Sequence, residues 1–155
     1  VRAMGRQAAG VQGIRLGKED AVTSMDVVDK EGALLVVTTN GFGKQTPLKE
    51  YTPKGRATGG ISTIDQKALE EIGKIAAARV VNKDDDLTIM TANGVAIRLK
   101  VKDVKQSGRA TRGVHLIKPQ DGDSVASVAR ISADDLKKAG AQLEEQEAEP
   151  QPKLV

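Results

Sequence analysis

The chain has 155 residues, enough for one ordinary domain with a sizeable core, and its hydrophobic fraction of 39% is normal for a globular protein. Phe42 and Tyr51 are the only aromatic residues, so a core is expected to consist of Val, Ile, Leu and Ala. The absence of cysteine excludes disulfides and thiolate metal sites, and no apolar run approaches the ~18 residues of a membrane span. These features predict a cytoplasmic protein that does not enter a membrane.

The net charge of +3 is unevenly distributed along the chain. Residues 1–130 carry 21 of the 24 Lys and Arg and 15 of the 21 Asp and Glu, a net charge of +6, whereas residues 131–155 have a net charge of −3. A basic body with an acidic tail predicts a polyanionic partner and a tail that competes for the same surface. The alternative is that these charges serve solubility alone.

One short motif occurs three times. Its clearest copy is residues 108–117, which repeats closely at residues 55–64 and more weakly at residues 5–14. We call these segments the Gly-Arg motifs. Each begins with a small, basic, Gly-bounded stretch and continues with alternating apolar residues, a pattern typical of a bend that leads into a half-buried strand. A repeat of about 50 residues is typical of a propeller blade and not of a helical solenoid.

The middle of the chain predicts one complete blade. Residues 21–28 are expected to close the preceding repeat as a strand, and residues 34–38 begin the next one. Asn40-Gly41 then favours a type I′ hairpin, because both positions tolerate positive φ. The return strand leads into the second Gly-Arg motif, and residues 74–81 supply the fourth strand of the blade.

The segment that contains this fourth strand also carries a competing signal. Residues 65–81 are rich in Ala, Glu, Lys and Leu, so intrinsic propensity alone predicts a helix. The repeat places residues 74–81 on the strand that residues 124–131 form in the next copy. We therefore expect a strand at 74–81, with a helical turn confined to residues 66–71.

The last repeat keeps the spacing of the previous one. Residues 87–94 align with residues 34–41, and the return strand alternates apolar residues with Arg98, Lys100 and Lys102. The chain is therefore predicted to be all-β, with blade repeats at about 1–31, 32–84 and 85–131. Two of these blades should have four strands, and the first should be incomplete, since the chain begins in mid-strand like a piece of a longer protein.

The acidic tail is expected at residues 132–155. Ser132 and Asp135 have the spacing of a capping box, which predicts a short helix to about Ala139. From Gln142 onward, four glutamates and two prolines predict disorder.

The sequence carries few groups suited to catalysis. His115 lies alone in a predicted strand, Tyr51 has no evident partner, and the acidic run at residues 84–86 lacks the Gly and distal Glu of a calcium loop. We expect this run to be a solvated turn. No phosphate-binding loop, dinucleotide fingerprint or zinc spacing is present, so the chain is predicted to be non-enzymatic and to bind no cofactor or metal.

Basic residues are more prominent. Between residues 94 and 118, seven Lys and Arg accompany the single acid Asp103, and the previous repeat has further cations in the equivalent region. Repeated blades would place these charges along a curved rim, which suits a bent duplex because phosphate contacts need only charge along a path. The near absence of aromatic residues argues against single-strand binding. The alternative is that the charges protect exposed strand edges.

Residues 34–51, with the motif segments 1–6 and 108–114, closely resemble a blade of the C-terminal domain of bacterial DNA gyrase A, and the likeness extends over residues 1–131. The resemblance implies a β-pinwheel, a propeller-like disc whose blades exchange strands and which wraps duplex DNA around a basic rim. In the whole type II topoisomerase, this wrapping supports ATP- and Mg²⁺-dependent negative supercoiling. The phosphate contacts it implies are Lys44, Lys54, Arg56, Arg98, Lys100, Lys105, Arg109 and Arg112.

The resemblance has two departures. The family's Arg/Gly-rich heptapeptide box is absent, and residues 54–60, at the corresponding place in their own blade, resemble it only weakly. The DNA-cleaving domain with its catalytic tyrosine is also absent from this sequence, so the chain by itself is expected to be non-catalytic. Its implied partners are double-stranded DNA, the rest of gyrase A and the companion protein gyrase B, at the bacterial nucleoid.

Two alternatives stay open at this point. One is the homologous subunit of topoisomerase IV, whose blades are usually more degenerate. The other is a propeller scaffold that binds proteins, which would present an apolar or aromatic rim and bind with little dependence on salt.

The acidic tail is expected to modulate wrapping, as tails do in some members of the family that the chain resembles.

Overall fold

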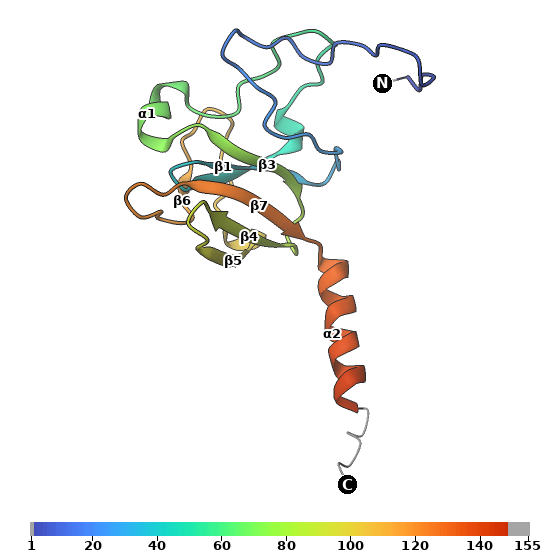
Figure 1. Ribbon diagram of the computed structural model, residues 1–155, viewed down its shortest axis with the longest axis vertical. Coiled ribbons are helices and arrows are strands. Elements are labelled where there is room, and N and C mark those ends of the chain that lie inside the picture. Colours follow the sequence, from blue (N-terminus) through green and yellow to red (C-terminus); the bar gives the residue numbers. More distant parts are fainter. Residues whose placement is uncertain (1, 149–155) are drawn as a thin grey trace.

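The computed structural model describes residues 2–148, with the side chains described as far as residue 140. Two antiparallel sheets stack on one another, the N-terminal segment covers one end of the stack, and a single helix projects from the other (Figure 1). The predicted all-β class is confirmed.

The first sheet has four strands in the order β3-β1-β2-β6. Its centre is the hairpin of β1 (Ala33–Thr38) and β2 (Phe42–Pro47), and β3 (Ile75–Val81) pairs antiparallel with β1. The outer strand β6 (Val114–His115) comes from the third Gly-Arg motif, far along the chain, and pairs with Phe42 and Gly43. The repeats therefore exchange a strand, as the resemblance implied.

The second sheet has three strands in the order β5-β4-β7. They are β4 (Asp86–Thr91), β5 (Ala96–Lys100) and β7 (Val125–Ile131). The prediction of two complete four-stranded blades is therefore wrong for the last one. In the first sheet the fourth strand comes from the following repeat, whereas the last repeat is followed by a helix that supplies no such strand.

The two hairpins are where the sequence places them, but their turn type differs from the prediction. Gly41 N–H donates to the Thr38 carbonyl at 3.0 Å, and Gly41 has φ of 81° whereas Asn40 is not among the residues with positive φ. A type I′ turn needs positive φ at both central residues, so this prediction is wrong. Only the glycine that follows the turn adopts the left-handed region, and Gly94 does the same with φ of 86°.

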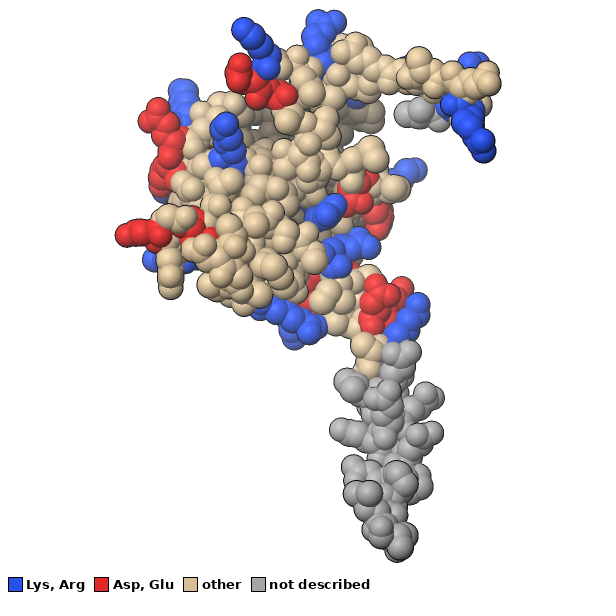
Figure 2. Space-filling model, in the orientation of Figure 1, with Lys and Arg blue, Asp and Glu red and all other residues tan. Residues whose placement is uncertain are grey.

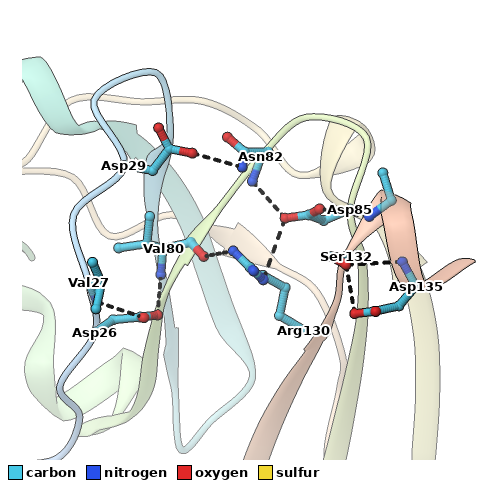
Figure 3. A network of polar contacts seen from close by, with 10 residues as sticks. Asp26, Val27, Asp29, Val80, Asn82, Asp85, Arg130, Ser132 and Asp135 are labelled. Atoms are coloured by element: carbon cyan, nitrogen blue, oxygen red, sulfur yellow. Dashed lines mark hydrogen bonds and ion pairs between the residues drawn. The ribbon is translucent and has the colours of Figure 1, made fainter.

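Residues 21–28 do not form the predicted strand. They run beside β3 in an extended path, held by side chains in place of a backbone ladder (Figure 3). Ser24 Oγ accepts from the N–H of Ala78 at 3.1 Å, and Asp26 Oδ2 accepts from the N–H of Val80 at 2.9 Å. These oxygens satisfy edge donors of β3 that a paired strand would otherwise satisfy.

The conflict between helix propensity and repeat position is resolved as the repeat predicts. Residues 75–81 form β3, and helical structure is confined to a 3-10 turn at Gln66–Ala68 and the short helix α1 (Leu69–Ile72). Two further 3-10 turns, Leu48–Glu50 and Val101–Asp103, follow β2 and β5.

Helix α2 (Ala133–Ala148) is longer than predicted. The serine half of the predicted capping box is confirmed, because Ser132 Oγ accepts from the N–H of Asp135 at 3.1 Å, but the Asp135 carboxylate accepts from the Ser132 hydroxyl at 2.7 Å in place of the Ser132 N–H. The helix passes both the predicted end at Ala139 and the predicted start of disorder at Gln142. The rest of the predicted disordered tail, from residue 149, lies outside the described residues.

The core is aliphatic, as the composition predicts. Its main cluster lies between the two sheets and includes Leu35, Val37, Leu87 and Ile89, each at most 1% exposed. A smaller cluster forms around Phe42 on the other face of the first sheet. Among residues 2–148, no helix has the length and apolar composition to cross a membrane.

Candidate nucleic-acid interface

The three Gly-Arg motifs, separated by about 50 residues in sequence, lie side by side in the fold. Arg15 N–H donates to the Thr58 carbonyl at 2.9 Å, which joins the first motif to the second. Asp65 N–H donates to the Thr111 carbonyl at 3.4 Å, which joins the end of the second to the third. The motifs thus form one continuous surface, which we call the motif band, made of residues 5–15, 55–65 and 108–113.

The motif band and its margins carry most of the predicted contact residues. Lys54 and Arg56 are exposed at the second motif, and Lys105 is exposed just before the third. Arg109 is half-buried, with Nη1 3.4 Å from the Ser62 carbonyl. On the visible face, most Lys and Arg side chains lie toward the margin, around an uncharged centre (Figure 2).

Two of the predicted cations are paired with carboxylates. Arg112 Nη1 lies 3.0 Å from Glu71 Oε2, and both side chains are more than half exposed. Arg98 Nη2 lies 2.7 Å from Asp86 Oδ2, a carboxylate that is only 12% exposed. Within residues 2–140, the ion pairs involve neither the exposed candidates Lys54, Arg56, Lys100 and Lys105 nor the half-buried Arg109.

Lys44 does not lie on the surface. It is 1% exposed, and its Nζ donates to the carbonyls of Gly108 and Arg109 at 2.7 and 2.6 Å and to Thr111 Oγ1 at 3.2 Å. Burial lowers the pKa of Lys44 to about 8, with Glu50 and Asp65 acting in the opposite direction. The three acceptors favour the protonated form, which has three N–H donors. The prediction that Lys44 contacts phosphates at the surface is therefore wrong.

A second basic group surrounds β5 and the start of α2. A surface hollow of about 470 Å³ is lined by Arg98, Lys100, Lys102 and Lys83, together with three aspartates and Leu136. Lys83 is not among the predicted phosphate contacts, because it directly precedes the acidic run 84–86 and the local net charge there is negative. The tertiary structure alone places Lys83 beside the cations of β5.

The acidic run was predicted to be a solvated turn, and this is wrong for Asp85 and for Asp86, which are both buried, Asp86 as the first residue of β4. Asp85 is 3% exposed and accepts from the N–H of Asn82 at 2.8 Å and of Ala133 at 3.1 Å (Figure 3). Arg130 Nε lies 3.7 Å from the same carboxylate. Asp85 therefore joins the turn before β4 to the end of β7 and the start of α2.

The groups considered for catalysis are engaged in structural contacts. The His115 ring lies against Phe42 with ring centroids 3.9 Å apart, and the Tyr51 hydroxyl hydrogen-bonds Thr63. The described side chains include no group of three or more His, Cys, Asp or Glu that could hold a metal ion. What the arrangement offers chemically is positive charge along a surface.

Sequence comparisons agree with the fold. The chain matches the model of the family described as "DNA gyrase C-terminal domain, beta-propeller" over residues 1–29, 33–82 and 85–132. It is 44% identical over 137 residues to DNA gyrase A of Staphylococcus epidermidis and 40% identical over 132 residues to that of Salmonella typhimurium. These alignments cover 87% and 85% of this chain but only 15% of each relative.

Two solved structures share the architecture. The DNA gyrase A C-terminal domain superimposes with a TM-score of 0.77 and 26% identity, over 85% of this chain and 44% of that one. The C-terminal domain of DNA topoisomerase IV gives a TM-score of 0.76 and 26% identity, over 89% and 43%. The two structures do not separate the alternatives, but the family model and the sequence relatives named above are those of gyrase. The chain belongs to the DNA gyrase C-terminal domain family of β-propeller proteins.

Proposed function

We propose that this chain is a duplex DNA-binding and wrapping module of DNA gyrase A, and so part of a type II topoisomerase. The observation that carries the proposal is the motif band, in which segments from three repeats meet and present cations along one continuous surface. Because a phosphate backbone is a regular line of negative charge, such a surface binds duplex without reading its sequence.

Exposure and pairing decide which residues are proposed as phosphate contacts. Lys54, Arg56, Lys100, Lys105 and Arg109 lie outside the ion pairs of the described residues and are the main contacts. Arg98 and Arg112 can exchange or share their carboxylate partners with phosphates. Lys83 and Lys102 join the set because they line the same hollow as Lys100.

In the whole enzyme, wrapping by this module supports negative supercoiling, and the module itself is non-catalytic. Its partners are double-stranded DNA, the remainder of gyrase A and the companion protein gyrase B, in the bacterial cytoplasm at the nucleoid. ATP and Mg²⁺ are assigned to other parts of the assembly. These statements rest on membership of the family and on the basic surface.

A protein-binding scaffold is the second candidate. An apolar hollow of about 930 Å³ lies between the N-terminal segment and the first sheet, lined by residues that include Leu16, Val22, Met25 and Ile61. Exposed apolar surface favours protein contact. Binding through it would depend little on salt, which separates this candidate from the first.

The test is the affinity of the chain for a plain duplex of random sequence, measured across salt concentrations. We expect the logarithm of the binding constant to fall linearly with the logarithm of salt, with a slope of about 0.9 for each phosphate engaged. Duplexes of different sequence should bind alike. A folded chain that does not bind at low salt would overturn the proposal and leave the scaffold as the better candidate.

A further inference from the structure

Three consecutive residues of β2 hold a loop that belongs to the next repeat. Lys44, Gln45 and Thr46 all direct polar side-chain atoms toward residues 101–111, which connect β5 of the second sheet to β6 of the first. This loop and the short segment after it carry four basic residues, namely Lys102, Lys105, Arg109 and Arg112.

Lys44 holds the far end of the loop. Its ammonium group, 1% exposed, donates to two consecutive carbonyls, of Gly108 and Arg109, and to the Thr111 hydroxyl. The carbonyl of Arg109 thus lies 2.6 Å from a buried cation. The guanidinium of Arg109, at the same residue, is directed to Ser62 on the neighbouring motif.

Gln45 and Thr46 hold the near end and the middle of the loop. Gln45 Nε2 donates to the carbonyls of Val101 and Val104 at 3.1 and 2.7 Å. Thr46 Oγ1 donates to the Ser107 carbonyl at 2.8 Å. The backbone adds two bonds, from Gln45 N–H to the Lys105 carbonyl and from Ser107 N–H to the Gln45 carbonyl. The loop has little regular structure of its own, so these contacts fix its path.

The other blade supplies an internal comparison. The repeat aligns Lys44, Gln45 and Thr46 with Ile97, Arg98 and Leu99 of β5. Ile97 and Leu99 have no polar side-chain atoms, and Arg98 pairs with Asp86 of its own sheet. This blade is followed by α2 and not by another Gly-Arg motif. Lys44, Gln45 and Thr46 therefore occur on the blade that contacts a basic loop of the following repeat.

We propose that Lys44, Gln45 and Thr46 are positioning residues that fasten the basic loop, residues 101–111, in the conformation in which it meets phosphates. They do so without touching DNA themselves. The contacts stand on their own, and their consequence for DNA rests on the proposed function.

The first test needs no DNA. Lys44→Met keeps an unbranched side chain of similar volume, one atom shorter, but removes all three donors, and Lys30→Met removes the same charge from an exposed turn. We expect amide hydrogen exchange of residues 101–113 to accelerate roughly tenfold or more in Lys44→Met, with β1 and β4 unchanged. Lys30→Met should leave both regions unchanged. Unchanged exchange in the loop of a folded Lys44→Met chain would overturn the proposal.

The second test measures duplex binding by the same variants across salt. We expect the salt slope of Lys44→Met to fall by about 0.9 for each phosphate contact that the released loop loses, whereas Lys30→Met keeps the wild-type slope. If exchange in the loop of Lys44→Met accelerates while the salt slope of duplex binding stays unchanged, the loop conformation is not needed for phosphate contact, and that part of the proposal is refuted. If the wild-type chain itself does not bind, the proposed function fails, and the exchange test still decides whether the three residues fasten the loop.

Thr46→Val covers the case in which Lys44→Met does not fold. It keeps the shape of a buried side chain, 1% exposed, and removes a single bond to Ser107. We expect faster exchange confined to the same loop, with the rest of the fold unchanged. Wild-type exchange in the loop of Thr46→Val, when Lys44→Met is unfolded, would count against the proposal.

Discussion

Asp85 shows at the scale of one residue how a polar side chain can serve as a junction. It accepts hydrogen bonds from two segments, the turn before β4 and the start of α2, and pairs with Arg130 on β7. The carboxylate is buried, at 3% exposed, so it holds these segments together from inside the fold. Removal of the carboxylate therefore leaves the N–H groups of Asn82 and Ala133 without their acceptor, and Arg130 keeps its hydrogen bond to the Val80 carbonyl but loses its ion pair.

We predict that Asp85→Ala lowers the free energy of unfolding by about 2–4 kcal/mol. The neighbouring Asp84→Ala removes the same charge from an exposed position and should change it by about 0.5 kcal/mol or less. Urea unfolding of the two variants beside the wild type measures both values. Equal effects of the two substitutions would contradict the structural role of Asp85.

Asp26 gives a prediction for pH at the same scale. The hydrogen bond from Val80 N–H is the main cause that lowers the pKa of Asp26 from its usual 3.8. Because the folded state lowers this pKa, the contact contributes stability above pH 3.8 and is lost as the pH falls through the lowered value.

We expect the amide resonance of Val80 to titrate with a midpoint below 3.8, as segment 21–28 detaches from β3. Asp26→Asn keeps an oxygen acceptor and should abolish this titration. Nuclear magnetic resonance measures both. A midpoint at or above 3.8 would contradict the contact.

At the scale of elements, the two hairpins provide a matched pair. Gly41 and Gly94 follow equivalent turns with φ of 81° and 86°, but their surroundings differ. A Cβ at Gly41 would collide with the carbonyl of Ile117, which belongs to the exchanged segment after β6, whereas a Cβ at Gly94 meets nothing within 4 Å. An alanine at Gly94 therefore costs backbone strain alone, whereas the additional cost of an alanine at Gly41 measures the packing of the exchanged segment.

We predict that Gly94→Ala lowers the free energy of unfolding by about 1 kcal/mol, since the cost is strain at positive φ alone. Gly41→Ala should cost about 2–4 kcal/mol, because the new methyl also displaces the exchanged segment. Thermal or urea unfolding provides the comparison. Equal costs at the two positions would mean that the exchanged strand contributes little to stability.

At the scale of the whole molecule, charge is divided between a basic body and an acidic C-terminal end. Residues 141–155 contain four glutamates and one lysine. Truncation after Gly140 removes them but keeps the Ser132 cap and the contact of Ala133 with Asp85. We predict roughly two- to tenfold tighter duplex binding by the truncated chain at low salt, with the difference disappearing at high salt.

A full-length chain with Gln in place of the four glutamates is the control for this truncation, because it keeps the length and removes the charge. Its affinity should match that of the truncated chain. Unchanged duplex affinity in both variants, measured at low salt, would exclude competition by the acidic end.

The sequence alone determined the features that depend on local pattern and spacing. Alternation and the repeat predicted β-structure, the positions of both hairpins and β3 in a segment with helical propensity, and the serine of the capping box set the start of α2. The predictions of the hairpins and of the helix start hold because strand periodicity, turn glycines and capping act between residues that are near in the chain, whereas β3 was predicted by the repeat against the local helix propensity. Seven of the eight predicted contact residues are also at least partly accessible, since charged side chains are rarely buried.

Only the tertiary structure decided which segment covers which face. Lys44 is an ordinary cation of an alternating strand until a loop more than sixty residues later closes over it. Asp85 becomes buried because α2 begins beside it, Lys83 joins the cations of β5, and helix α2 instead of a strand follows β7 of the three-stranded sheet. Burial and strand exchange are contacts between distant segments, and no local pattern contains the geometry that brings those segments together.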